Sequence, residues 1–288
     1  MIALSMLSLT ACDSLDMKGM FFCSGPSVED RVEESLAWNK AHGEPVLHGV
    51  SDNYRFYVCS DTHVDDSVAR VVRFLAREQA DPDSRFSIIM GDLANKAGEE
   101  PYSMIGQAID SRTAQGGVDP NPCYIILGNH DLYFDCYGYY SQYFHTSTYT
   151  LVVETVGGKK DLYIFLDSGN ATHGARQMVW LREVLSHRDE YRHCIVCTHT
   201  SLFRNSYDYS TTPAANFPLD EYYTLLDLMS KSRVDLFLMG HFHHKEWHTL
   251  SGVEYVMADN LNESVEAPSY VVVDCSDESV KWQYKDLY

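Results

Sequence analysis

Short apolar runs alternate with amphipathic segments along most of this 288-residue chain, and this alternation restricts the fold more than any other feature. The runs at residues 54–61, 86–92 and 123–131 have the length and apolar character of buried strands. Residues 65–79 and 174–185 instead place their apolar side chains at helical spacing. Strands that alternate with helices pair in parallel through right-handed crossovers, so the pattern predicts an α/β fold.

The second half of the chain extends this pattern and then changes it. We expect a hairpin with arms at residues 149–156 and 161–167, joined through Gly157 and Gly158. The other expected elements are a helix at 219–229 and strands at 193–199, 234–241, 246–250, 254–257, 270–274 and 280–284. The strand-only tail predicts a second sheet with antiparallel pairing. The expected fold class is therefore α/β, a two-sheet mixed β-sandwich flanked by helices.

The N-terminal residues resemble a bacterial lipoprotein signal. Residues 2–10 are apolar and uncharged, too short to span a membrane but long enough for the apolar region of a signal peptide. A lipobox-like Leu-Thr-Ala-Cys sequence follows and ends at Cys12. We expect residues 1–12 to be a lipoprotein signal with lipidation at Cys12, and 13–45 a tether and N-terminal extension with a helical patch at residues 32–38. Residues 46–288 are the expected folded domain. The alternative is an ordinary secretory signal with an unmodified cysteine.

Acidic residues outnumber basic residues by 41 to 22, which gives a formal net charge of −19. A surface this acidic repels nucleic-acid backbones, so a protein that wraps a polyanion is not expected. A phosphate-bearing ligand would need a local positive centre. Cys194 and Cys197 have the spacing of a redox pair, but residues three apart on a strand face opposite sides, so we expect both to be buried structural residues.

Polar clusters follow five of the expected strands. They are Asp61-Thr62-His63, Gly91-Asp92, Gly128-Asn129-His130-Asp131, Thr198-His199 and Gly240-His241-Phe242-His243. Ligands of α/β folds collect at the carboxyl ends of strands, so the clusters are expected to converge, with the glycines where the backbone turns or approaches closely. The side chains of metal-ligand type are Asp61, His63, Asp92, Asn129, His199, His241 and His243. Carboxylate, amide oxygen and imidazole together suit Mn, Fe or Zn better than Mg or Ca.

Each of these residues has a simpler structural interpretation when it is taken alone. An Asp at a strand end commonly caps a turn, and a His in an apolar run is commonly a hydrogen-bonded core residue. Five such clusters in one order, each directly after a strand, favour a shared metal site.

The order D-x-H, G-D, G-N-H-D, H and G-H-x-H resembles the pattern of the calcineurin-like metallophosphoesterase family over residues 50–260. The resemblance implies two divalent or trivalent metal ions per chain, with Asp92 bridging. It assigns one ion to Asp61, His63, Asp92 and His243, and the other to Asp92, Asn129, His199 and His241. It also implies hydrolysis of a phosphate mono- or diester by in-line attack of a metal-bridged hydroxide, with His130 acting on the leaving oxygen.

Two positions near these motifs affect the expected chemistry. Many family members carry an acidic residue three positions after the bridging Asp, where it orients the catalytic His, and this chain has Asn95 there. Asn95 or Asp131 is therefore the candidate partner of His130. Asn129 and Arg204 are candidate contacts of the substrate phosphate, and for Arg204 the alternative is packing of a long loop.

The function expected from these residues is a metal-dependent phosphatase or phosphodiesterase acting on a small phosphoester. The alternative is a non-catalytic envelope scaffold with a structural or vestigial metal site. The expected location is the bacterial cell envelope, lipid-anchored through Cys12 and facing the periplasm or the cell surface. The pattern does not distinguish monoesterase from diesterase activity, because one fold and metal site serve both.

Overall fold

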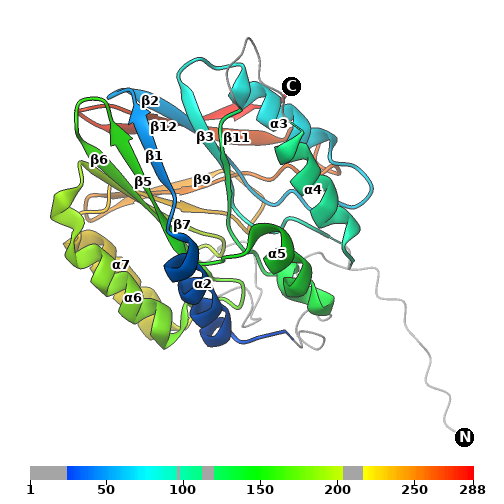
Figure 1. Ribbon diagram of the computed structural model, residues 1–288, viewed down its shortest axis with the longest axis horizontal. Helices are drawn as coiled ribbons and strands as arrows, with labels where there is room; N and C mark the ends of the chain where they lie inside the picture. The colour runs from blue at the N-terminus through cyan, green and yellow to red at the C-terminus, as the bar shows by residue number, and fades with distance from the viewer. Residues whose placement is uncertain (1–24, 96–97, 112–119, 204–216) are drawn as a thin grey trace, which may run out of the picture.

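Two β-sheets pack face to face, and helices cover their outer faces (Figure 1). The computed structural model describes residues 25–95, 98–111, 120–203 and 217–288 of the chain. The two mixed sheets and their flanking helices confirm the expected fold class.

The seven-stranded sheet has the strand order β1-β5-β6-β7-β8-β10-β9. Its strands are β1 (Val46–Val50), β5 (Tyr149–Thr155), β6 (Lys160–Leu166), β7 (His193–Thr198), β8 (Leu236–Met239), β10 (Val253–Met257) and β9 (Glu246–Leu250). The five-stranded sheet has the order β12-β11-β2-β3-β4. Its strands are β12 (Val280–Asp286), β11 (Ser269–Cys275), β2 (Tyr54–Cys59), β3 (Ser84–Ile89) and β4 (Cys123–Ile125).

The helices divide between the two outer faces. Helices α6 (Gly174–Ser186) and α7 (Leu219–Lys231) cover the seven-stranded sheet. Helices α3 (Ala69–Gln79), α4 (Glu100–Asp110) and α5 (Tyr137–Phe144) cover the five-stranded sheet. The N-terminal helix α2 (Val28–His42) packs beside α6, and two short 3₁₀ segments, η1 (His130–Asp135) and η2 (Arg188–Glu190), complete the described elements.

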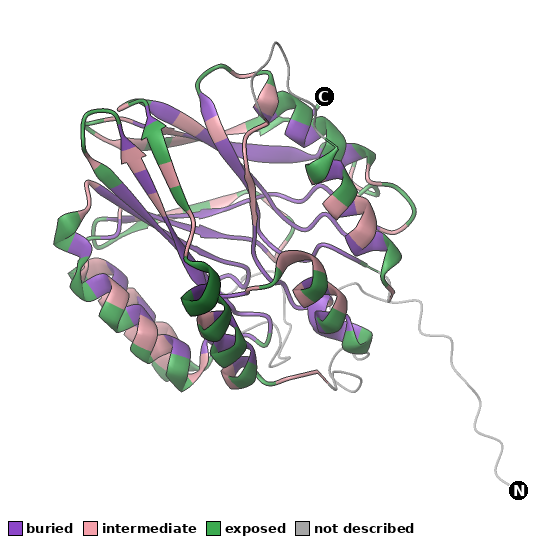
Figure 2. Ribbon diagram, viewed as in Figure 1, coloured by how far each residue is buried: buried purple, intermediate pink, exposed green. Residues whose placement is uncertain are grey.

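The main core lies between the sheets, and most strand residues there are buried (Figure 2). Alternation along the strands produces this arrangement, because successive side chains point to opposite faces. Val271 and Val273 of β11 pack between the sheets, whereas Val272 faces the outer helices. Cys197 likewise joins the central core and Cys194 the cluster beneath α6 and α7, which confirms that they face opposite sides. Both are free, buried cysteines.

The expected hairpin is confirmed, since β5 and β6 pair antiparallel, and β6-β7-β8 and β2-β3-β4 pair in parallel as expected. The tail is arranged differently from the prediction. Strands β9 and β10 extend the seven-stranded sheet, while β11 and β12 extend the five-stranded sheet. The tail strands therefore pair with the open edges of β8 and β2, whose backbone groups would otherwise lack partners.

Residues 25–45 are the described part of the expected tether and N-terminal extension. They contain α2, whose first turn is closed by a reciprocal capping box between Ser27 and Asp30. Strand β1, which the sequence pattern did not predict, follows α2 and pairs in parallel with β5. Cys12 lies outside the described residues. Within the described residues, no helix has the length and apolarity needed to cross a membrane.

Candidate metal centre

Strands of both sheets end at one edge of the sandwich and bring the polar clusters together there. Asp61 and His63 follow β2, Asp92 follows β3, and His130 follows β4. His199 follows β7 of the other sheet, and β8 is followed by the remaining two histidines, His241 and His243. The convergence expected from the sequence is thus present in the structure.

One group of potential ligand atoms belongs to Asp61, His63, Asp92 and His243, and these atoms all lie within 4.8 Å of one another. The Nε2 atoms of His63 and His243 are 3.0 Å apart. His243 Nε2 lies 3.2 Å from Asp61 Oδ1, and His63 Nε2 lies 3.7 Å from Asp92 Oδ2. Four potential ligand atoms this close together form a candidate cation site.

A second group consists of Asp92, His199 and His241, again with ligand atoms within 4.8 Å of one another. His199 Nε2 is 3.3 Å from Asp92 Oδ1 and 3.0 Å from Oδ1 of Asn129. Asn129 therefore joins this group through its amide oxygen. Because Asp92 belongs to both groups, its carboxylate can bridge two neighbouring ions.

The backbone is strained at most of the candidate ligands. Residues with φ in the left-handed region are Asp61 (50°), His63 (42°), Asp92 (51°), His241 (80°) and His243 (56°). Non-glycine residues adopt such angles at a cost of about 1–3 kcal/mol each and retain them where the surroundings enforce them. Hydrogen bonds between loops supply that enforcement here, including those from Asp61 N to Gly91 O and from His63 N to Asp92 O.

Glycines allow the loops at the strand ends to approach one another closely at this site. A Cβ atom on Gly128 would lie 2.2 Å from both the backbone nitrogen and Oδ1 of Asp92. A Cβ atom on Gly240 would lie 2.0 Å from Ser60 Oγ and 3.1 Å from Asp61 Oδ2. Close approach, which the sequence suggested, explains both glycines.

Two buried carboxylates at the centre require compensating positive charge. Asp61 is fully buried, Asp92 is 2% exposed, and Asp61 Oδ1 has no hydrogen-bond partner in the described structure. Burial alone would raise the pKa of both carboxyls, but neighbouring imidazoles, foremost His243 for Asp61 and His199 for Asp92, lower it below the usual range. Asp61 Oδ1 faces His243 Nε2 at 3.2 Å but accepts no well-aligned hydrogen bond, and a buried carboxylate oxygen of this kind fits a bound cation.

The candidate histidine ligands differ in pKa, because burial and the Asp61 and Asp92 carboxylates act on each to a different extent. Burial lowers the pKa of His63 and of His241 to about 4, so both rings are neutral near pH 7 and present a lone pair. Burial also disfavours charge on His199, but Asp92 and Asp61 outweigh it and raise its pKa to about 10. His63 and His241 thus present lone pairs, whereas a cation bound by His199 would replace the proton on its Nε2. Imidazoles and carboxylates together form the donor set that Mn, Fe and Zn use.

His130 lies beside this centre without the partner that we expected for it. Its ring contacts the His63 ring edge-on, with centroids 4.5 Å apart, and its Nδ1 has no hydrogen-bond partner among the described residues. Asn95 donates instead to Asp65 Oδ2, at 3.0 Å. The expected hydrogen bond from the His130 imidazole to Asn95 or Asp131 is therefore not formed in the described structure.

Asp131 has a structural position instead. Its Oδ1 accepts hydrogen bonds from Leu93 N and Tyr102 Oη, and its Oδ2 accepts one from Gly128 N. The carboxyl joins the loops that follow β3 and β4, which carry Asp92 and Asn129. Burial, reinforced by the charge of Asp92, raises its pKa to about 7.

Two contacts at the centre were not predicted from the sequence. Tyr133 Oη accepts a hydrogen bond of 2.5 Å from Asn129 Nδ2, and Asn260 Nδ2 donates to the backbone carbonyl of His243 at 3.1 Å. The contact between Tyr133 and Asn129 is local in the sequence, because only four residues separate the two positions. Arg204 lies outside the described residues, so its candidate role remains a prediction.

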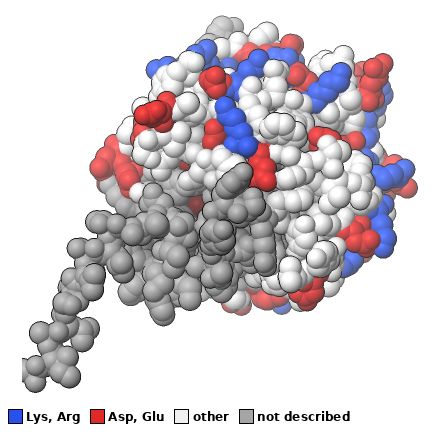
Figure 3. Space-filling view, turned by 180° about the vertical axis from the view of Figure 1, so that it is seen from behind, with Lys and Arg blue, Asp and Glu red and all other residues white. Residues whose placement is uncertain are grey.

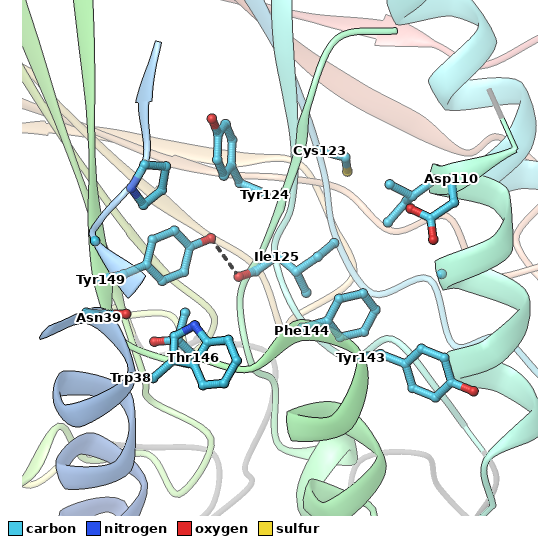
Figure 4. A pocket seen from close by; sticks show the side chains of 14 residues that line it. Trp38, Asn39, Asp110, Cys123, Tyr124, Ile125, Tyr143, Phe144, Thr146 and Tyr149 are labelled. Carbon is cyan, nitrogen blue, oxygen red and sulfur yellow. Dashed lines mark hydrogen bonds between the residues drawn. The ribbon is translucent and has the colours of Figure 1, made fainter. Parts of the chain in front are cut away.

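A cavity of about 330 Å³ lies elsewhere, among α2, α4, α5 and β4 (Figure 4). Its lining is rich in aromatic side chains such as Trp38, Tyr124 and Tyr149, and Tyr149 Oη donates to Ile125 O there. None of the seven candidate ligands lines it, so the chemistry of the strand ends is independent of this cavity.

The fold is similar to that of several solved structures. One is GAP50, the anchor in the inner membrane complex of Plasmodium, with a TM-score of 0.63, 14% identity, and coverage of 82% of this chain and 85% of that one. Another is the purple acid phosphatase PPD1 from yellow lupin, with a TM-score of 0.56 and 14% identity. The match covers 85% of this chain and 53% of that one. A third, from Staphylococcus aureus, is described as a candidate 5′-nucleotidase, with a TM-score of 0.51, 16% identity, and coverage of 82% and 54%.

The chain thus spans about half the length of the last two proteins. At these identities the likeness concerns the fold alone. No curated protein sequence matches the chain. The model of the calcineurin-like phosphoesterase family matches residues 54–245, a span that contains all seven candidate ligands. The match covers well over half of the chain, and the protein therefore belongs to the calcineurin-like phosphoesterase family.

Proposed function

We propose that this protein is a metal-dependent hydrolase of small phosphoesters with two ions at the strand ends. The observation that carries the proposal is the position of Asp92, whose carboxylate belongs to both groups of potential ligands. Metal ions bound there supply Lewis-acid activation of water and neutralise negative charge on the phosphoryl group. The rest of the proposal concerns what the protein's own residues do.

The two groups would hold one ion each. Asp61, His63 and His243 provide the remaining donors of the first, and His199, His241 and Asn129 those of the second. The identity of the ions is proposed from the donors: mixed imidazole and carboxylate favour Mn, Fe or Zn. Together with the family match, the buried and unsatisfied Asp61 Oδ1 supports this assignment.

His130 is the proposed proton donor to the leaving oxygen. Its backbone N–H donates to Asp92 Oδ1 at 2.8 Å, which fixes the loop beside the shared carboxylate. The ring is only partly buried, so its outer edge is accessible to a ligand. A positioned imidazole that transfers a proton contributes about 10²–10⁴-fold to such reactions.

The charge of the protein favours small substrates over polymers. Acidic and basic side chains are interspersed on the described face shown in Figure 3, and the whole chain carries −19. At the centre, two divalent ions would outweigh the negative charge of the Asp61 and Asp92 carboxylates, so the local charge would be positive. A small phosphoester can reach this centre, whereas a long polyanion meets the acidic exterior.

The proposal is tested by hydrolysis of an aryl phosphate and an aryl phosphodiester with added Mn²⁺ or Zn²⁺. Asp92→Asn should lower kcat/KM by more than about a hundredfold, because even partners outside the ligand shell cost 10–100-fold. Asp227→Asn, which removes an exposed carboxylate paired with Lys231 on α7, is the matched control and should leave turnover unchanged. Equal activity of Asp92→Asn and the wild type would contradict the proposal.

The alternative function is an envelope scaffold whose metal site is structural. The fold itself does not decide between the two, since a protein described as an anchor shares it. Tight binding of two ions without turnover of either ester would favour the scaffold. For either function we propose attachment to the bacterial cell envelope through a lipid on Cys12.

A further inference from the structure

Tyr133 lies directly beside the candidate metal centre although it is not one of its ligands. It belongs to η1, is 8% exposed, and lies four residues after Asn129. The backbone leaves the helical conformation at Tyr133 itself (φ −69°, ψ 145°), and Phe134 and Asp135 then have positive φ. This kink holds the phenol inside the loop that carries Asn129 and His130.

The phenol contacts both of these residues. Its hydroxyl accepts a 2.5 Å hydrogen bond from Asn129 Nδ2, and its ring centroid lies 4.7 Å from that of His130. Asn129 is 4% exposed, so its amide has little access to water as an alternative partner. One side chain therefore constrains a candidate ligand and the candidate proton donor together.

The orientation of the Asn129 amide matters for metal binding. His199 Nδ1 lies 2.7 Å from Met90 O, which can only accept, so Nδ1 carries a proton and Nε2 is the nitrogen that faces the site. Nε2 lies 3.0 Å from Asn129 Oδ1, an acceptor. A proton on Nε2 can join these two atoms in the metal-free protein, and a bound cation would replace that proton. Rotation of the amide would replace Oδ1 with an NH₂ group, which repels a cation.

We propose that Tyr133 is a positioning residue that orients the amide of Asn129 toward the second metal site and supports the ring of His130. Without the hydroxyl, Asn129 Nδ2 is left buried and unsatisfied, which favours rotation of the amide. Partners of this kind change metal affinity by about 10–100-fold in other metal sites. The inference rests on the proposed metal centre.

The test is calorimetric titration of metal-free protein with Mn²⁺ or Zn²⁺, which does not depend on turnover. Tyr133→Phe removes the hydroxyl and keeps the ring, and it should weaken the second binding event about tenfold or more. Tyr140→Phe is the matched control, because this buried tyrosine donates instead to the backbone carbonyl of Thr146. The control should bind metal within about twofold of the wild type, since its hydroxyl contacts no candidate ligand.

A double mutant separates this role from general destabilisation. Asn129→Ala alone should weaken the second site, and adding Tyr133→Phe to it should cause no further loss, because the two changes remove one interaction. Wild-type affinity in Tyr133→Phe, with weakened binding in Asn129→Ala, would overturn the inference and leave the metal centre intact. Unchanged affinity in Asn129→Ala would contradict the proposed centre itself.

Two further measurements keep the inference testable if Tyr133→Phe folds poorly. Difluorotyrosine at position 133 nearly keeps the shape of the side chain. At a pH that keeps its more acidic phenol neutral, it weakens the hydroxyl as an acceptor, so it should also lower affinity for the second ion. With an aryl phosphate at saturating metal, Tyr133→Phe should recover its kcat, whereas Tyr133→Ala should not, because only the latter removes the support of His130. Wild-type affinity with difluorotyrosine would contradict the role of the hydroxyl at Asn129. Equal kcat in Tyr133→Phe and Tyr133→Ala would contradict the support of His130 by the ring.

Discussion

Arg31 in the first turn of α2 and Asp167 directly after β6 form a bidentate ion pair in which both side chains are fully buried. Arg31 Nε lies 2.8 Å from Asp167 Oδ2, and Nη2 lies 2.8 Å from Oδ1. Arg31 Nη1 also donates to Pro26 O, and Asp167 accepts from Ser147 Oγ. The pair fastens the N-terminal helix to the sandwich, although α2 precedes the span matched by the family model.

Removal of one partner of this pair should destabilise the protein. Arg31→Ala leaves the buried carboxylate of Asp167 without its cation, and the expected loss is about 3–5 kcal/mol in the free energy of unfolding. The measurement is urea denaturation monitored by fluorescence and circular dichroism. Arg176→Ala, which breaks exposed pairs with Glu29 and Glu33, should cost at most about 1 kcal/mol. Equal losses in the two variants would refute the proposed fastening of α2.

The close approach at Gly128 predicts a selective effect on metal binding. Gly128→Ala places a Cβ atom 2.2 Å from Asp92 N and Oδ1, so the loop carrying the shared carboxylate must move. We expect a loss of stability of about 1–3 kcal/mol and loss of high-affinity metal binding. Gly138→Ala in α5 is the control, since its Cβ would meet no atom within 4 Å and should be tolerated or slightly stabilising. Normal metal titration of Gly128→Ala would show that the glycine is dispensable.

His193 predicts a pH dependence of stability away from the metal centre. Burial disfavours its charged form, but the Asp235 carboxylate, 3.6 Å from Nδ1, and the carbonyl of Ser276, 2.6 Å from Nε2, outweigh burial and raise its pKa above 6.5. A group whose pKa is higher in the folded state adds stability that is fully present below about pH 6.5 and is lost as the pH rises through the folded value.

His193→Gln removes this titration while keeping a donor for Ser276 O. The difference in unfolding free energy between wild type and variant should therefore be larger at pH 5.5 than at pH 8.5. Urea denaturation at both pH values measures this, and NMR titration of the imidazole gives its pKa directly. A difference that does not change with pH would contradict the raised pKa of His193.

The lipid anchor is tested by fractionation of cells that express the full chain. Wild-type protein should sediment with membranes and incorporate a labelled fatty acid, because one lipidated cysteine places apolar chains in the bilayer. Cys12→Ala should release the protein from the membrane fraction and abolish labelling, whereas Cys23→Ala is the matched control. Unchanged partitioning of Cys12→Ala would refute lipidation at this position.

The candidate ligands at the strand ends were predictable because each is marked by its neighbours in the sequence. Asp61, Asp92 and His199 each follow an apolar run, and parallel strands carry such residues to one edge of a sheet. The Arg31–Asp167 pair was not predictable in this way, since 136 residues separate its members and neither lies in a recognisable motif. The placement of β9 and β10 in one sheet and of β11 and β12 in the other was not predictable either. It depends on the unpaired edges of β8 and β2, which form only in the folded sheets.

The expected partner of His130 illustrates a different limit. Asn95 and Asp131 both lie near the right positions in the sequence, but the direction of their side chains depends on tertiary contacts. Asp131 turns toward Gly128 and Leu93, and Asn95 toward Asp65. Spacing along the chain indicates which residues share a loop and does not determine which hydrogen bond each one makes.

The central claim is that a dinuclear metal centre shared through Asp92 supports phosphoester hydrolysis. The most direct measurement is turnover of an aryl phosphate and an aryl phosphodiester by metal-free protein as Mn²⁺ or Zn²⁺ is added, with bound metal counted in the same samples. We predict that hydrolysis rises to a plateau at two ions per chain. A folded protein that binds two ions per chain and hydrolyses neither ester would contradict it.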